Sequence, residues 1–134
     1  MGTRADFYVG RGEKAEWLGS IAWDGHPEGL DAPQLLAATG EPHYRWEVAK
    51  LLAARDDATV PADGWPWPWK DSQTTDYALA FDEGRVWASP FGHGWWLASE
   101  TEPDNEDESK TAIFPDMTAQ RKVTFGKRSG VIII

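Results

Sequence analysis

The sequence predicts an α+β fold in which two helices are inserted between the second and third strands of a mostly antiparallel sheet. Three observations support this prediction. Residues 6–10 read as a strand, and in residues 16–23 and 77–81 apolar residues alternate with polar or small ones, a pattern typical of strands. Apolar residues between the second and third of these segments follow helical spacing instead. Glycine-containing turns follow several of the expected strands, which favours hairpins.

The first two strands are expected to form a β-hairpin. Residues 6–10 are followed by a glycine-containing turn at 11–14 and then by the second strand. The period of two in that strand places Trp17, Ile21 and Trp23 on one face. We therefore expect Trp17 and Trp23 in the core.

Two helices are expected next. Asp31 can cap the first helix, with Gln34 reaching back toward it, and Gly40 ends it. The second helix covers about residues 42–55. Its expected buried stripe consists of Tyr44, Val48, Leu51 and Leu52. Trp46 lies off this stripe, so it must pack elsewhere or be partly exposed.

The remainder of the chain predicts a meander. Strands are expected at residues 77–81, 85–90 and 95–99, with a turn after the first of them. A last pair of strands is possible at 123–125 and 131–134. We expect a single domain over residues 1–134, because the sequence contains no repeat and no linker long enough to divide it.

The composition excludes several classes of protein. The net charge of -9 disfavours direct binding to nucleic acid or to anionic membranes, but it would attract a basic protein. The absence of cysteine excludes disulfides and cysteine-ligated zinc. No apolar run approaches the ~20 residues of a membrane span, and no targeting signal is evident at the start. We therefore expect a cytoplasmic protein in a bacterial or infected host cell.

Motifs for enzymatic chemistry are weak. Residues 10–15 match a dinucleotide-binding pattern, but the next segment is expected to be a strand where that site needs a helix. His26, His43 and His93 are dispersed, without the spacing of a metal site. We expect no cofactor, no metal and no identifiable catalytic residue. A hydrolase or nuclease that combines these histidines with carboxylates remains an alternative.

The tryptophan-rich segment at residues 65–69 is the first candidate binding site. Trp65 and Trp67 each precede a proline, which predicts a stiff, extended chain. In a polyproline helix the rings of Trp65, Trp67 and Trp69 would point about 240° apart, so at least one would meet solvent or a partner. Alternatively, the segment is a stiff loop packed over the core.

Two further regions complete the candidate site. His93 lies between two glycines, in a tight turn or beside a ligand, and Trp95 and Trp96 should face opposite sides of a strand. An acidic run follows, which we expect to be a flexible loop at 100–110; it is either simply solvated or imitates phosphates toward a basic protein cleft. Its candidate binding residues are Glu100, Glu102, Asp104, Glu106, Asp107 and Glu108.

Residues 3–10, 16–21 and 76–81 resemble uncharacterised small proteins of bacteriophages and prophages. This resemblance implies an accessory role in a bacterial cytoplasm and implies no catalytic residues. The leading hypothesis is a non-enzymatic protein-binding factor that engages a host or phage protein through exposed tryptophans and the acidic surface. A small-ligand or carbohydrate-binding domain that uses residues 65–69 is the second hypothesis.

Overall fold

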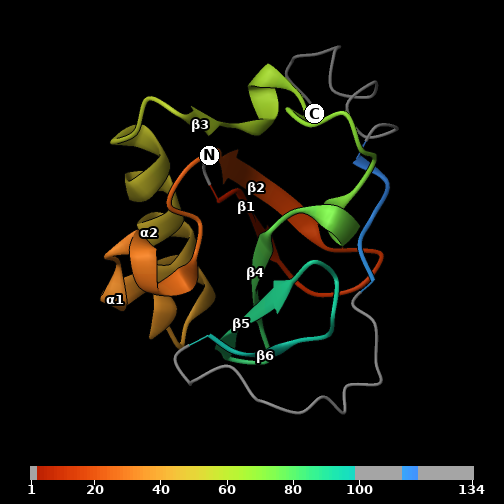
Figure 1. Cartoon of the computed structure of the whole chain (residues 1–134). Coiled ribbons are helices and arrows are strands. Elements are labelled where there is room, and N and C mark those ends of the chain that lie inside the picture. Colours follow the sequence, from red (N-terminus) through yellow and green to blue (C-terminus); the bar gives the residue numbers. More distant parts are fainter. Residues whose placement is uncertain (1–2, 99–112, 118–134) are drawn as a thin grey trace.

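The chain forms a six-stranded sheet in the order β3-β2-β1-β4-β5-β6, with two helices against it (Figure 1). The computed structural model describes residues 3–98 and 113–117. The acidic loop expected at 100–110 and the strands expected at 123–125 and 131–134 therefore lie outside the described residues. The expected combination of a sheet with two helices is confirmed.

The predicted hairpin is confirmed. β1 (Ala5–Val9) and β2 (Glu16–Ile21) pair antiparallel. Gly10 and Gly12 in the turn have φ angles of 90° and 95°, which glycine adopts readily because it lacks a Cβ. A strand follows this turn, so residues 10–15 are not followed by the helix N-terminus that would hold a pyrophosphate.

A β-bulge changes which residues of β2 share a face. The pairing with β1 skips Leu18, so the side chains on either side of it no longer alternate regularly. Trp17 and Ile21 consequently belong to different core clusters. Trp23 lies beyond the strand and is 53% exposed. The expectation that these three side chains share a buried face was therefore wrong.

The sheet is mixed. β4 (Tyr77–Asp82) pairs parallel with β1 and antiparallel with β5 (Arg85–Pro90). The short strands β3 (Ala58–Thr59) and β6 (Trp96–Leu97) lie at the two edges. The expected mostly antiparallel sheet was wrong, because the chain returns to the centre of the sheet beside β1. Hydrophobic alternation identifies strands, but it does not determine the direction in which distant strands pair.

The first helix, α1 (Pro33–Leu36), is a single turn. Asp31 does not cap it as expected, because its φ angle is 55° and the N-cap residue is Ala32. An N-cap residue typically has an extended backbone, whereas the backbone of Asp31 adopts the left-handed conformation. Short 3-10 helices occur in the connections: η1 (Pro27–Leu30), η2 (Pro61–Asp63) and η3 (Ser72–Thr74).

The second helix, α2 (Glu41–Ala53), follows the predicted pattern. Tyr44, Val48 and Leu52 are buried, whereas Leu51, which was also expected in the buried stripe, is only partly buried. Trp46, off this stripe, is 58% exposed, and the Lys50 ammonium lies 4.2 Å from the centroid of its ring. Within the described residues, no helix has both the length and the apolar character needed to cross a membrane.

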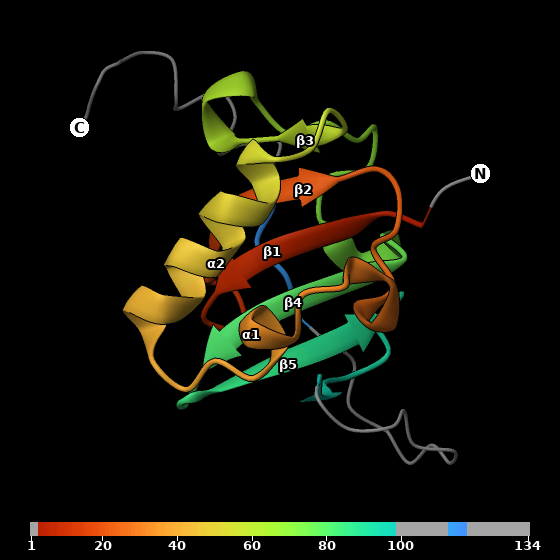
Figure 2. The same cartoon turned by 90° about the vertical axis from the view of Figure 1, so that its left-hand side faces the viewer.

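Both faces of the sheet carry a hydrophobic cluster. α1 and α2 cover one face (Figure 2). The cluster on that face includes Phe7, Ile21, Tyr44, Val48, Leu79 and Phe81. The other cluster consists of Tyr8, Ala15, Trp17, Trp65, Ala78, Ala80, Phe114 and Met117. The tryptophan-rich segment therefore packs on the face of the sheet opposite the helices.

Candidate functional site

The tryptophan-rich segment bends instead of extending as a straight polyproline helix. The chain bends at residues 67–70, and the rings of Trp67 and Trp69 stack at 5.6 Å with an interplanar angle of 18°. Trp65 is only 2% exposed and meets Trp17 edge to face at 5.0 Å. The expected fan of three rings is therefore absent, and Trp65 belongs to the core.

The polar ends of all three indoles bond inside the protein. Trp65 Nε1 donates to the carbonyl oxygen of Trp69 at 2.6 Å, and Trp69 Nε1 donates to Thr75 Oγ1 at 2.8 Å. Trp67 Nε1 donates to Asp6 Oδ1 at 2.7 Å. An indole has only this one donor. These bonds attach the segment to β1 and to the chain before β4.

Asp6 is a fully buried carboxylate beneath this segment. Besides Trp67, its Oδ1 accepts a bond from Ser20 Oγ at 2.5 Å, and its Oδ2 accepts one from Ser72 Oγ at 2.5 Å. Ser72 Oγ also lies 2.7 Å from the Tyr8 hydroxyl. Because Ser72 gives its only proton to Asp6, the Tyr8 hydroxyl must donate to Ser72. We call these five residues the Asp6 network.

Burial shifts the pKa values of the two titratable members of the Asp6 network, Asp6 and Tyr8. Desolvation raises the pKa of Asp6 above 3.8, and the hydrogen bonds from Ser20, Ser72 and Trp67 oppose that rise. Burial also raises the pKa of Tyr8, and the charge of Asp6 adds to this effect. Since Asp6, Ser20 and Ser72 are buried, their arrangement is suited to holding residues 65–69 against the sheet, not to meeting a substrate.

Arg4 covers the stacked pair of rings. Its guanidinium carbon lies 5.6 Å from the ring centroids of both Trp67 and Trp69, and its Nη1 lies 3.7 Å from Asp76 Oδ2. A cation over an aromatic face is attracted by the ring quadrupole. Arg4 thus occupies part of the aromatic surface that a sugar or peptide would otherwise use.

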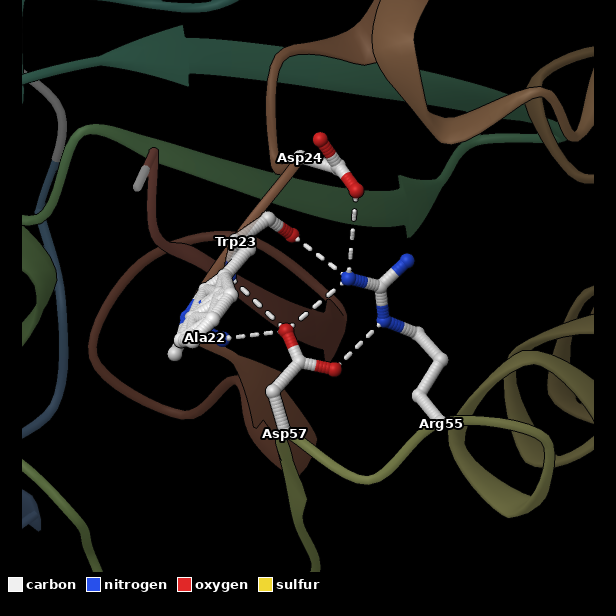
Figure 3. Close-up of polar contacts among 5 residues, drawn as sticks. All are labelled: Ala22, Trp23, Asp24, Arg55 and Asp57. Atoms are coloured by element: carbon white, nitrogen blue, oxygen red, sulfur yellow. Dashed lines mark hydrogen bonds and ion pairs between the residues drawn. The ribbon is translucent and has the colours of Figure 1, made fainter. Parts of the chain in front are cut away.

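Trp23, in contrast to Trp65, has a largely exposed ring. Its side chain is 53% exposed, while its backbone is held by Asp57 and Arg55, which follow α2. Asp57 Oδ2 accepts bonds from the backbone N–H groups of Ala22 at 3.1 Å and Trp23 at 2.8 Å. Arg55 Nη2 donates to the carbonyl oxygen of Trp23 at 2.8 Å. Figure 3 shows the indole extending away from the guanidinium.

Arg55 and Asp57 also bind each other directly. Arg55 Nε donates to Asp57 Oδ1 at 2.7 Å, and Arg55 Nη2 donates to Asp57 Oδ2 at 2.9 Å (Figure 3). Such two-point pairing fixes the relative orientation of both groups. Arg55 lowers the pKa of Asp57, and Asp57 raises the pKa of Arg55. Asp24 Oδ2 lies 3.6 Å from Arg55 Nη2 and is 67% exposed.

Of the other predicted binding residues, the structure describes two, one in the turn after β5 and one in the edge strand β6. His93 is exposed in the turn after β5, and Trp96 is half-buried in β6, where it pairs with Ala88. Trp95 is half-buried against Phe114, with ring centroids 5.5 Å apart. The acidic candidates Glu100, Glu102, Asp104, Glu106, Asp107 and Glu108 lie outside the described residues.

The histidines come from three different parts of the fold. His26 lies before η1 with its ring 5.0 Å from that of Tyr77, and His43 Nε2 lies 3.1 Å from Glu47 Oε2 on α2. His93 lies in the turn after β5. Across residues 3–98 and 113–117, no group of three or more His, Asp or Glu side chains is placed to hold a metal ion.

Comparison with known proteins found no matching family model, no matching curated protein and no matching solved structure.

Sequence reasoning missed two polar groups that organise these surfaces. Asp6 shares a strand face with Tyr8, so a polar residue at an inward position was a signal that could have been used. The Asp57 contact to Trp23 spans 34 residues, and no local pattern indicates it.

Proposed function

We propose that this chain is a non-catalytic protein-binding factor that engages a basic protein through exposed tryptophans and its acidic surface. Its setting, in this proposal, is the cytoplasm of a bacterial or infected host cell. The resemblance of residues 3–10, 16–21 and 76–81 to small phage and prophage proteins supports that setting.

The exposure of Trp23 and Trp46 is the main support for the proposal. They are 53% and 58% exposed, whereas Trp17 and Trp65 are 6% and 2% exposed. Tryptophan is enriched among the residues that dominate binding energy at protein interfaces, because it buries a large apolar area. Two largely exposed rings on a chain that buries others so completely favour a binding role.

The net charge of -9 supports a basic partner. A negative field accelerates encounter with positively charged proteins and repels nucleic acid. Such attraction weakens as salt screens it.

Binding of a carbohydrate by residues 65–69 is less well supported. The three indole N–H groups of the segment already bond to Trp69, Asp6 and Thr75. Arg4 covers the stacked rings of Trp67 and Trp69. A sugar would have to displace Arg4 and would find no free indole donor in this segment.

Affinity enrichment from a lysate of the cells that carry the gene tests the proposal. The full chain would be compared with a Trp23→Ala/Trp46→Ala double variant and with Ile113→Ala, whose side chain is 54% exposed in the parent chain. We expect a defined set of basic proteins that the parent and Ile113→Ala retain at about 50 mM salt and release at about 500 mM. The double variant should not retain them. Equal retention by all three chains, or no retained protein, would contradict the proposal.

A further inference from the structure

Trp23 differs from Trp46 in how its surroundings hold it. Its N–H and carbonyl groups are both bonded, to Asp57 at 2.8 Å and to Arg55 at 2.8 Å. The N–H of Ala22 bonds to the same carboxylate oxygen. The backbone that carries the ring is thus fixed by side chains from the connection between α2 and β3, while the ring itself remains in solvent.

This arrangement lowers the entropy that binding would remove. A fixed backbone leaves only the two side-chain torsions of tryptophan to be ordered. The exposed ring contributes no burial to the fold comparable with that of Trp17 or Trp65. A large apolar group on a rigid support is the arrangement expected of a preorganised interface residue.

The charges around Trp23 indicate what the partner must carry. Asp24 is 67% exposed, and Asp56 is exposed between Arg55 and Asp57. The Arg55 guanidinium is already bound to Asp57, and its Nη2 lies 3.6 Å from Asp24 Oδ2, so two carboxylates adjoin one positive charge. The excess of negative charge is complementary to lysine or arginine side chains.

We propose that Trp23 inserts into an apolar pocket on a partner protein, that lysine or arginine residues rim this pocket, and that Asp24 and Asp56 face those residues. This inference rests on the proposed function and assigns it to one surface. Trp46 serves as the comparison for Trp23. Its ring is exposed to a similar extent, but it lies beside Lys50 on α2, in a different charge environment.

Site-specific photocrosslinking tests the assignment. Benzoyl-phenylalanine would replace Trp23, Trp46 or Ile113 in three separate full-length chains, which would be irradiated in a lysate of the cells that carry the gene. Crosslinked peptides would then be identified by mass spectrometry. We expect a crosslink from position 23 to a peptide that lines an apolar pocket with lysine or arginine beside it. A parallel Asp24→Asn/Asp56→Asn variant of the position 23 chain should reduce that crosslink several-fold.

The possible results separate the two proposals. Crosslinks to a basic protein from position 46 or 113, with none from 23, would overturn this inference and leave the proposed function standing. A crosslink from position 23 to an acidic or uncharged surface would overturn the stated chemistry of the partner. The absence of crosslinks from all three positions would count against both proposals.

Discussion

Trp67 and Asp6 are 61 residues apart in the sequence, and the indole Nε1 of Trp67 donates a hydrogen bond of 2.7 Å to the buried Asp6 carboxylate. This contact joins the proline-rich segment to the central strand β1. It explains why the ring of Trp67 faces the interior, although its sequence context suggested an exposed binding ring.

Replacing Trp67 by phenylalanine removes this bond and keeps an aromatic ring. We expect the free energy of unfolding to fall by about 2 kcal/mol, because a buried carboxyl group loses one of its hydrogen-bond donors. Urea denaturation provides the measurement. Trp46→Phe is the control and should change stability little, since Trp46 is exposed; equal effects of the two substitutions would show that the Asp6 contact is unimportant.

Asp6 should make the fold less stable as pH rises. Burial raises the pKa of Asp6 in the folded chain above its ordinary value of 3.8. At pH values between 3.8 and this raised pKa, the folded state therefore binds more protons than the unfolded state. The stability that the protonated group contributes is complete below pH 3.8 and is lost as pH rises through the folded pKa. Relative to Asp6→Asn, the parent chain should lose stability over this range. Parallel pH profiles for the two chains would refute this expectation, and Asp31→Asn, at an exposed position, is the control.

Asp57 should act in the opposite direction. Arg55 lowers its pKa below 3.8, so the stability that its charge contributes is present above pH 3.8 and is lost as pH falls through the folded pKa. Asp57→Ala should cost about 1–3 kcal/mol near neutral pH, because the N–H groups of Ala22 and Trp23 lose their acceptor. The loss should shrink in acid. The exposed neighbour Asp56→Ala is the matched control, and an equal loss in that variant would argue against a specific role for Asp57.

Gly19 permits the close approach of α2 to the sheet. A Cβ at this position would lie 2.6 Å from Leu52 Cδ1 and 2.8 Å from the carbonyl oxygen of Thr59, and its φ angle is 150°. Gly19→Ala should therefore destabilise the fold by at least about 2 kcal/mol. At Gly40, where a Cβ would meet no atom within 4 Å, the same substitution should be tolerated. Thermal unfolding of the two variants compares them, and similar melting temperatures would disprove the packing argument.

Local patterns in the sequence predicted the parts of the fold that local forces determine. The burial of Tyr44, Val48 and Leu52 and the position of Trp46 off their stripe followed from helical spacing. The hairpin followed from alternation and from the glycine-containing turn between its strands. These features depend on residues that are close in sequence.

Features that depend on distant residues were not predictable in this way. The parallel pairing of β1 with β4 and the hydrogen bonds that Ser72 and Trp67 donate to Asp6 join residues more than 60 positions apart. The bulge at Leu18 separated Trp17 from the face of Ile21, and β2 ends at Ile21, before Trp23. The tryptophan on which our proposal centres was therefore placed in the core by the sequence pattern.

The dissociation constant of the crosslinked partner, once purified, tests the role of Trp23 most directly. It would be measured by calorimetry against the parent chain, Trp23→Ala and Trp46→Ala. Our account predicts that Trp23→Ala weakens binding at least about tenfold, as removal of a dominant interface residue does, and that Trp46→Ala changes it less than about threefold. Unchanged affinity of the Trp23→Ala chain would contradict the account.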